Sequence, residues 1–214
     1  MKKSIYLLWS TLLFLLSSCF APLNSVYDTA KLLEKKETRI SANYSKYYGS
    51  EEFLSDFVNL NDNFGFSLGY GLSDKFNISC RYEYLKIKLG SIEIFNETVE
   101  MDNDLNYFEI GCKIRLIKDK LALGIPVGLY NWEGTSFISI DPRLYFTIRK
   151  SDKFDFSVIP KTHIFIDDGV NLLPGLSLGI GLSNNLDKWA IRPEVGFDGY
   201  LNFGIGVNYN FNKK

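Results

Sequence analysis

An alternation of large apolar residues with small or polar ones runs through most of the chain after Thr38, and it restricts the fold more than any other feature. At residues 64–72 the sequence FGFSLGYGL places Phe, Leu and Tyr on one face of a strand and Gly and Ser on the other. Residues 175–182 and 201–211 repeat this arrangement. Side chains change face at every residue of a strand but follow a 3.6-residue period in a helix, so the alternation predicts β-strands.

Ten segments carry this alternation, and we expect strands at 38–47, 64–72, 76–87, 106–117, 121–131, 137–149, 154–166, 173–182, 189–197 and 200–211. Short connections with an Asp-Lys pair alternate with connections that are mostly longer. The short ones are 73–75, 118–120, 151–153 and 186–188, and the others are 48–63, 88–105, 132–136 and 167–172. The Asp-Gly pair at 198–199 predicts a two-residue type of hairpin turn.

Tight turns at one end and longer loops at the other are typical of outer-membrane barrels. The sequence therefore predicts an all-β fold in which residues 38–214 form a closed antiparallel up-and-down transmembrane β-barrel of about ten strands. We expect strand neighbours in sequence order and closure between the first and last strands. We name the two ends of this barrel the turn end and the loop end. An even strand number places both termini at the turn end.

The composition agrees with this class of protein. Mean hydropathy is close to zero, as expected when lipid-facing residues alternate with polar ones. The formal net charge of −1 gives no basic surface for nucleic acid. We find no metal-ligand spacing, no nucleotide-binding glycine motif and no nucleophile–base pair, so we expect no cofactor and no metal.

The orientation of the two strand faces separates a transmembrane barrel from a soluble lipocalin-like barrel with an apolar interior. The polar face is rich in Gly and Ser, which are poor residues for a water-facing strand surface. Ten strands of Leu, Ile and Phe would also overfill a small interior. Charged residues at mid-membrane on the lipid face would cost roughly 2–4 kcal/mol each. We therefore expect apolar side chains outside and, inside, a charged lumen network of Arg39, Arg81, Glu83, Glu109, Lys113, Arg115, Asp141, Arg143, Lys161, His163, Arg192 and Glu194.

Hairpin registers counted from the short turns place glycines opposite long charged side chains. The predicted pairs are Ser67 with Arg81, Gly65 with Glu83, Gly124 with Lys113, Gly128 with Glu109, Gly179 with Arg192, and Asp141 with Lys161 as a lumen salt bridge. Aromatic residues concentrate near both strand ends, as in interfacial girdles. Those near the turn end are Phe76, Phe154, Trp189, Tyr209 and Phe211, and those near the loop end are Tyr44, Tyr84, Trp132, Phe197 and Tyr200.

Residues 1–18 have the charged, apolar and small-residue order of a secretory signal peptide. The following LSSC resembles the lipobox of bacterial lipoproteins, which implies cleavage before Cys19 and lipidation of its sulfur. An ordinary signal peptide with a chance Cys and an uncleaved anchor helix are the alternatives. Phe20 in place of an Asp after the Cys is compatible, by analogy, with sorting to the outer membrane. Residues 19–37 form a periplasmic tether, in which Ser25 and Asp28 predict the cap of a short helix near or inside the periplasmic mouth.

The last strand ends in VNYNF, which resembles the C-terminal insertion signal of outer-membrane proteins, although NKK follows it. With its lipobox and hairpin repeat, the chain over residues 19–211 resembles the small outer-membrane barrel proteins of Bacteroidetes-type bacteria. That family is mostly of unknown activity. We expect a monomer in contact with outer-membrane lipids, and the even strand number predicts that the lipid on Cys19 lies on the periplasmic side.

Several features have both a structural and a functional interpretation. The charged lumen residues are interpreted either as ion pairs that fill a narrow barrel or as the lining of a pore or ligand site. His163 is the only histidine in the sequence. It is interpreted either as a lumen residue with its hydrogen bonds satisfied or, with Asp141, as an acid–base pair. Omptin proteases use such groups, but their motifs are absent. Prolines inside strands mark bulges or a weakened seam for lateral lipid entry, and they are Pro126, Pro142, Pro160, Pro174 and Pro193.

For Cys80 and Cys112 we expect no disulfide, because the register that would place them opposite each other also sets Glu83 against Glu109. A two-residue shift pairs Arg81 with Glu109 instead. We conclude that the sequence favours a structural or narrow-pore barrel lipoprotein without catalysis. A lipid-handling or small-ligand-binding barrel is the alternative, and an omptin-like or lipid-modifying enzyme comes third.

Overall fold

The computed structural model describes residues 25–50, 57–94, 97–132, 135–166 and 169–211. At 49–50, 57–61, 87–94, 97–103 and 132 it describes the backbone alone. The expected signal peptide, Cys19 and the first part of the tether lie outside the described residues.

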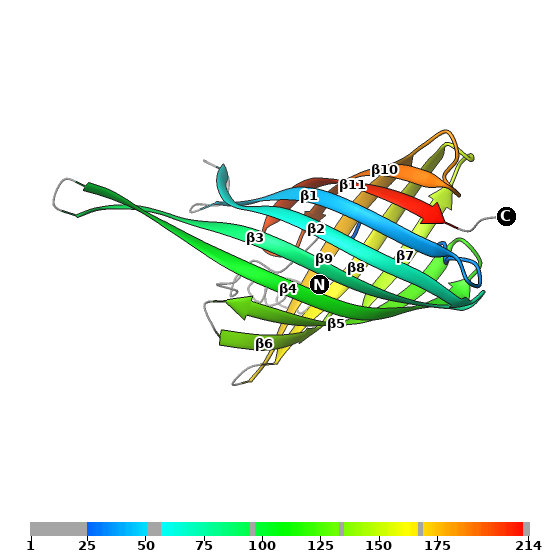
Figure 1. The fold of residues 1–214 in the computed structure, drawn as a ribbon, viewed down its shortest axis with the longest axis horizontal. Coiled ribbons are helices and arrows are strands. Elements are labelled where there is room, and N and C mark those ends of the chain that lie inside the picture. The colour runs from blue at the N-terminus through cyan, green and yellow to red at the C-terminus, as the bar shows by residue number, and fades with distance from the viewer. Residues whose placement is uncertain (1–24, 51–56, 95–96, 133–134, 167–168, 212–214) are drawn as a thin grey trace, which may run out of the picture.

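Eleven strands form one closed antiparallel sheet (Figure 1). They are β1 (Thr38–Ser50), β2 (Phe57–Ser73), β3 (Phe76–Ile94), β4 (Glu97–Ile117), β5 (Leu121–Trp132), β6 (Thr135–Ile140), β7 (Arg143–Arg149), β8 (Phe154–Ile166), β9 (Val170–Leu182), β10 (Trp189–Phe197) and β11 (Leu201–Phe211). Both β6 and β7 lie between β5 and β8, so together they fill one of ten strand positions. Pairing of β1 with β11 closes the ring, which confirms the predicted ten-stranded barrel and its neighbour order.

One predicted strand, 137–149, is divided at Asp141 and Pro142. Proline has no N–H for the ladder, and its ring constrains the backbone. The backbone N–H of Asp141 still donates to the carbonyl of Pro126 (3.0 Å), and that of Thr162 donates to the carbonyl of Pro142 (3.1 Å). The prolines therefore divide the strand without opening the barrel wall at this point.

The loop end extends further than the sequence indicated. We expected a connection at 88–105, but β3 and β4 continue through most of it and pair with each other out to Ile94 and Glu97. This hairpin projects beyond the other strands (Figure 1). Its residues are mixed polar and charged, so the apolar alternation that reports a lipid-facing strand stops while the strands continue.

Four of the six predicted register pairs are confirmed, and they lie in the two hairpins β2–β3 and β4–β5. The other two are wrong by two residues: Gly179 lies opposite Glu194, and Lys161 lies opposite Arg143. In the second case the N–H groups of Lys150 and Ser151 both donate to the carbonyl of Phe154, so the turn is centred one residue later than we expected. A one-residue change in the centre of a turn moves the register by two.

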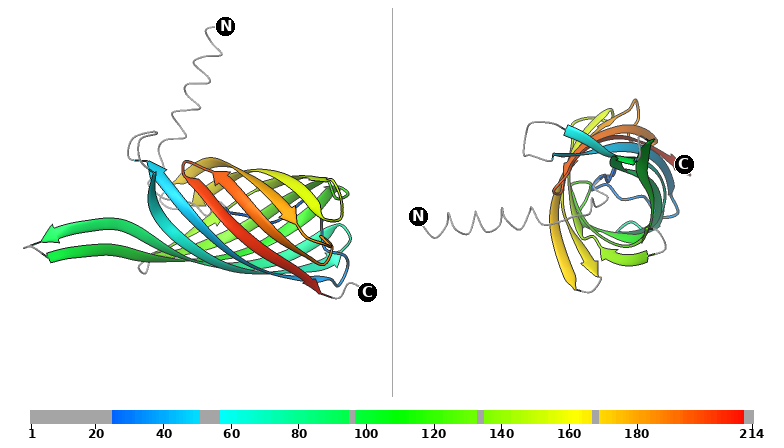
Figure 2. Two further views of the ribbon diagram at one scale, coloured as in Figure 1. Left: turned by 90° about the horizontal axis from the view of Figure 1, so that it is seen from above. Right: turned by 90° about the vertical axis from the view of Figure 1, so that its left-hand side faces the viewer.

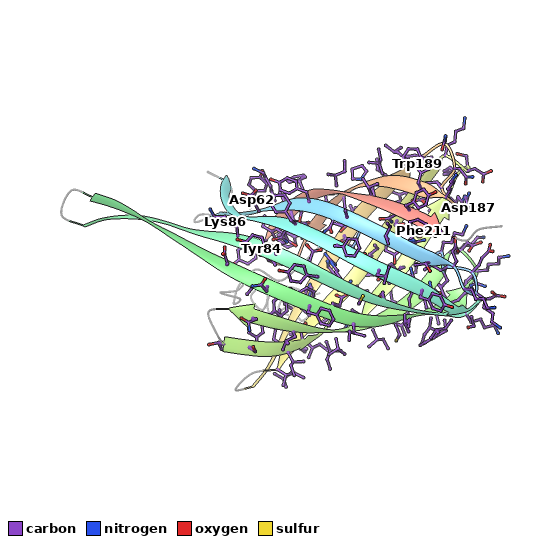
Figure 3. All side chains as sticks on the ribbon, viewed as in Figure 1. Asp62, Tyr84, Lys86, Asp187, Trp189 and Phe211 are labelled. Atoms are coloured by element: carbon purple, nitrogen blue, oxygen red, sulfur yellow. The ribbon has the colours of Figure 1, made fainter. Side chains whose placement is uncertain are left out.

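The outer wall is apolar around most of its circumference. Exposed large apolar side chains occur on every strand position except β1, with Phe64, Ile110, Ile148 and Leu172 all more than half exposed. Their sequence neighbours are buried, as the alternating pattern in β11 shows. Aromatic rings lie at both ends of this wall, among them Tyr84 at the loop end and Trp189 with Phe211 at the turn end (Figure 3). The apolar faces of the strands therefore point away from the barrel axis.

The chain before β1 contains no helix in its described part, residues 25–37. This differs from the short helix that we expected there. The segment is irregular, with left-handed backbone at Tyr27 and Lys36. Figure 2 looks into the barrel from the loop end and shows this segment inside the ring of strands.

Candidate functional site

Residues 25–37, which we name the lumen segment, run through the interior of the barrel. At one extreme the Ser25 hydroxyl lies 3.2 Å from that of Ser45 and 3.4 Å from that of Tyr47, in the part of β1 nearer the loop end. At the other, Lys36 N–H donates to the carbonyl of Gly71, beside the turn between β2 and β3. The chain then reverses into β1. Instead of hanging below the barrel as a tether, these residues occupy its lumen.

Backbone groups of the lumen segment find partners on the barrel wall. The Glu194 carboxylate accepts from the N–H groups of Val26 and Tyr27, both at 2.7 Å. The Asn208 amide donates to the carbonyl of Tyr27 (3.0 Å), and the N–H of Ala30 donates to the Thr147 hydroxyl (2.8 Å). Because a buried, unpaired backbone group is costly, these wall residues are what allows an irregular segment to lie inside.

Asp28 is the charged anchor of the lumen segment. One carboxylate oxygen lies 2.6 Å from the Arg39 guanidinium, and the other lies 2.6 Å from the Lys113 ammonium. The ammonium also donates to the carbonyl of Thr29 (3.0 Å) and lies 5.1 Å from the ring centre of Tyr145. The two cations in contact with its oxygens favour the ionised form of the carboxyl, which burial alone would oppose. Asp28 therefore binds the lumen segment to two strands through charged contacts.

Glycines on the inner wall provide the space for the lumen segment. A Cβ at Gly204 would lie 1.7 Å from the Tyr27 hydroxyl and 2.8 Å from the carbonyl oxygen of Tyr44. At Gly71 it would lie 1.9 Å from the carbonyl oxygen of Glu34. Some glycines of this face leave space for charged side chains, as Gly65 does for Glu83. Other glycines, such as Gly71 and Gly204, leave space for the lumen segment, which was not expected from the sequence.

Side chains of the wall fill the remaining interior with ion pairs. Arg81 Nε donates to Glu83 (2.6 Å), and Glu83 also accepts from the Asn43 amide (2.8 Å). Arg143 and Glu109 approach to 2.5 Å, and both are more than nine-tenths buried. These charges take part in pairs within the wall, which is the arrangement that a poorly solvated interior requires.

His163 lies between two carboxylates. Its Nδ1 is 2.8 Å from Asp141, and its Nε2 is 3.2 Å from Asp198 in a direction that does not make a hydrogen bond. Asp141 is also bound by the hydroxyls of Ser139 (2.9 Å) and Tyr107 (3.1 Å). The imidazole is fully buried, and both of its nitrogens face carboxylates. No side of the ring is therefore open to a substrate.

An aromatic cluster closes the interior next to His163. Tyr107 and Tyr130 have ring centres 4.4 Å apart, and Tyr130 stacks on Phe137 at 4.8 Å. Phe165 packs against the same group. A cavity of about 90 Å³ lies between the lumen segment and the wall strands β1–β5, β7 and β11, with Arg81, Glu109 and Lys113 among its lining. It has room for several waters, since one needs roughly 10–15 Å³.

The structure buries ten of the twelve residues of the predicted lumen network and leaves Arg39 and Arg115 partly exposed. Asp141 and Lys161 do not lie opposite each other; Asp141 contacts His163, and Lys161 donates to the Ser177 hydroxyl.

Some interior carboxylates among the described residues were not expected from the sequence, including Asp28, Asp155 and Asp198. Asp28 was assigned to a helix cap and Asp198 to a turn, where the chain does bend, with Gly199 at a φ of 89°. Asp155 forms a bidentate pair with Arg192 (2.9 and 3.0 Å). Its position at the start of a strand, opposite Gly181, was the one available signal.

Among the described residues, no group of three or more His, Cys, Asp or Glu could hold a metal ion. Within the same residues, no helix has the length and apolar character needed to cross a membrane. Cys80 and Cys112 are free thiols, as expected, and Arg81 lies opposite Glu109.

Comparison with known proteins finds no matching family model and no matching curated protein. Solved structures do match. An outer membrane channel from Pseudomonas putida F1 has 11% identity over 85% of this chain and 98% of its own, with a TM-score of 0.49. The translocator domain of the autotransporter NalP from Neisseria meningitidis has 7% identity, covers 84% and 89%, and has a TM-score of 0.45. The protein Ail of Yersinia pestis has 13% identity, covers 83% and 99%, and has a TM-score of 0.37. We infer function from the geometry of this chain alone.

Proposed function

We propose that this protein is a monomeric outer-membrane β-barrel lipoprotein, closed by its own lumen segment, with a structural and non-catalytic role. The membrane location is supported by the apolar outer wall, which has an exposed Phe, Leu or Ile on every strand position except β1. In water such a surface would be far larger than the apolar patches that soluble proteins tolerate. Outer-membrane lipid is its expected partner.

The observation that carries the closed state is the binding of Asp28 to both Arg39 and Lys113. These residues tie the lumen segment to β1 and β4, while Glu194 and Asn208 tie it to β10 and β11. A narrow pore through this barrel would conduct only after the segment moves, and each of these contacts opposes that movement.

Two alternatives receive less support. A cavity of about 90 Å³ is small for an acyl chain, and the ladder is bridged at Pro126 and Pro142, which disfavours lipid entry through the wall there. An acid–base role for His163 needs an accessible ring nitrogen, and both nitrogens face buried carboxylates. The charged interior is better explained as the packing of a narrow barrel.

Membrane fractionation with heat-modifiable gel migration tests the barrel, and planar-bilayer recording tests the closed state. We expect outer-membrane recovery, a folded-form shift and almost no steady current for the native protein. Asp28→Ala leaves Arg39 and Lys113 without their carboxylate, and we expect it to show intermittent openings. A large steady current from the native protein would contradict the closed state, and the absence of a folded-form shift would contradict the barrel.

A further inference from the structure

Four charged residues form a row across strands β1 to β4 at the loop end. The register places Lys46 opposite Asp62, Asp62 opposite Lys86, and Lys86 opposite Asp104. The signs of the charges therefore alternate along the row, and opposite charges directly across an antiparallel pair of strands stabilise the pair. We name these four residues the charged row, and Figure 3 labels Asp62 and Lys86.

The charged row lies on the outer face of the barrel. Successive side chains of a strand point to opposite faces, and the described sequence neighbours of these four residues are fully buried. The neighbours are Ser45 and Tyr47 beside Lys46, Asn63 beside Asp62, Leu85 beside Lys86, and Leu105 beside Asp104. Lys86 and Asp104 are exposed, and the Lys46 side chain is 39% exposed. These charges are therefore separate from the ion pairs that fill the interior.

A row of aromatic residues lies on the same face, two residues nearer the turn end. The register places Tyr44 opposite Phe64 and Phe64 opposite Tyr84. The Tyr44 hydroxyl donates to Asp62 (2.8 Å), and the Tyr84 hydroxyl donates to Asp104 (2.7 Å). Both tyrosines thus direct their polar ends toward the charged row. Aromatic rings with one polar end are typical of the interface between membrane and water.

From the aromatic residues to the turn end, the outer face of β2 is apolar. Its exposed side chains are Phe64, Phe66, Leu68, Tyr70 and Leu72. Phe64 and Leu72 lie roughly 20 Å apart along the barrel axis if the strands are tilted by about 40°. The apolar band of outer-membrane barrels is about 25 Å tall. The charged row therefore lies where the hydrocarbon ends and the lipid headgroups begin.

In the part of the wall that the structure describes, only one side of the barrel is charged at this level. The described outward residues at the loop end of β5 to β11 are uncharged, among them Asn131, Ser136, Ile166 and Phe197. Lipid headgroups beside β1 to β4 would thus meet fixed charges that the described opposite side lacks.

We propose that the charged row binds membrane lipids with zwitterionic headgroups, which carry both a phosphate and an ammonium group. Lys46 and Lys86 bind the phosphates, and Asp62 and Asp104 bind the ammonium groups. The row has two charges of each sign, so it complements a headgroup with both charges, whereas its carboxylates repel a purely anionic headgroup.

The contacts within the row do not prevent this binding. The Lys46 ammonium lies 3.4 Å from Asp62, and an ion pair at the surface contributes little to stability. A headgroup can therefore replace either partner at small cost. The inference rests on the proposed function, because it requires the apolar wall to lie in a membrane, and it adds the headgroup class of the lipid partner.

Native mass spectrometry of the detergent-folded protein with equal amounts of phosphatidylethanolamine and phosphatidylglycerol tests the inference. We expect the native protein to retain several-fold more phosphatidylethanolamine. Asp62→Lys with Asp104→Lys makes the row wholly basic, and we expect this variant to prefer phosphatidylglycerol. Asp74→Lys with Asp152→Lys is the matched control, because it changes the net charge equally at two exposed turn-end positions, and it should keep the native preference.

Three results would overturn the inference and leave the proposed function standing. They are equal retention of the two lipids by the native protein, inversion of the preference in the turn-end control as well, and a phosphatidylglycerol preference of the native protein that depends on added magnesium. The last result would assign the carboxylates of the row to a divalent cation. A protein without a folded-form shift would overturn the proposed function and this inference together.

Cysteine labelling tests the level of the charged row independently of the lipid class. Lys86→Cys and the matched control Phe66→Cys are made with Cys80 and Cys112 replaced by Ala, and each protein is folded into phosphatidylcholine vesicles. A water-soluble maleimide is admitted to both sides of the vesicles by freezing and thawing. We expect Lys86→Cys to react several-fold faster than Phe66→Cys. Equal protection of both thiols would place the row in hydrocarbon and overturn the inference.

Discussion

The interior of the barrel is filled in two different ways. Between β3 and β8, side chains of the wall meet each other, as in the Glu109–Arg143 pair and the stack of Tyr130 on Phe137. On either side of β1, strands β2 and β11 carry glycines that face a piece of main chain, at Gly71, Gly204 and Gly206. We name these the side-chain-filled part and the chain-filled part. The first depends on charge pairing within the wall, and the second depends on space and on partners for backbone groups.

The largest effect is expected from Arg143→Met in the side-chain-filled part. This change leaves Glu109 buried without its guanidinium, and breaking one partner of a buried pair costs about 3–5 kcal/mol. The midpoint of urea-induced loss of the folded gel form measures it. The double variant with Glu109→Met should recover most of the loss, since Tyr107 keeps Asp141 as an acceptor. A double variant as unstable as the single one would mean that this pair does not govern packing here.

A smaller but specific effect is expected from Gly204→Val in the chain-filled part. The new side chain would overlap Tyr27 and the carbonyl of Tyr44, and overpacking costs about 1–3 kcal/mol. The lumen segment should be displaced, and proteolysis of detergent-folded protein after Lys35 or Lys36 measures this. Gly179→Ala is the matched control, because its Cβ would make an ordinary contact at 3.6 Å. Equal protease resistance of both variants would contradict the seating of the segment on glycines.

Acidification is a third way to test the chain-filled part, through the retention of the lumen segment in the barrel. The ion pairs of Asp28 with Arg39 and Lys113 need its ionised carboxylate, so they stabilise the lumen segment at neutral pH and are lost when acid protonates the carboxyl, whose pKa in an unfolded chain is about 3.9. Between pH 5 and 8 we expect no change in the retention of the segment, and below pH 4 a progressive release. Asp28→Asn should weaken retention at neutral pH and flatten this acid response. An unchanged acid response in the variant would assign the effect to other carboxylates.

The smallest effect is expected outside both parts, at Asp152→Ala. Its carboxylate lies 2.8 Å from Arg149, but the side chain is 86% exposed. Exposed pairs contribute about 0–1 kcal/mol, so the urea midpoint should hardly move. A shift as large as that of Arg143→Met would mean that burial is not what distinguishes these pairs.

The two parts also differ in how far the sequence predicts them. Alternation identified the lipid-facing rows, and counting from the turns placed Glu83 opposite Gly65 and Glu109 opposite Gly128. These positions follow from a period of two, which every residue of a strand obeys. Where a turn was centred one residue later than assumed, as before Phe154, all pairs of that hairpin were displaced together.

The chain-filled part could not be predicted because the lumen segment has no period. Residues 25–36 have the composition of a short helix, but Glu194, Thr147 and Asn208 satisfy backbone groups of this segment in an irregular path. Those three partners are more than a hundred residues away in the sequence. Local propensity is outweighed here by tertiary partners.

The contacts of Tyr27 have a consequence for the order of assembly. Its backbone is held by Glu194 of β10 and Asn208 of β11, and only ten residues separate it from β1, which pairs with β11 to shut the ring. If the barrel closed before the lumen segment entered it, the segment would have to pass through one end of a closed barrel. We therefore expect the lumen segment to enter the barrel at the same time as β1 pairs with β11. A chain that fails in one of these steps should also fail in the other.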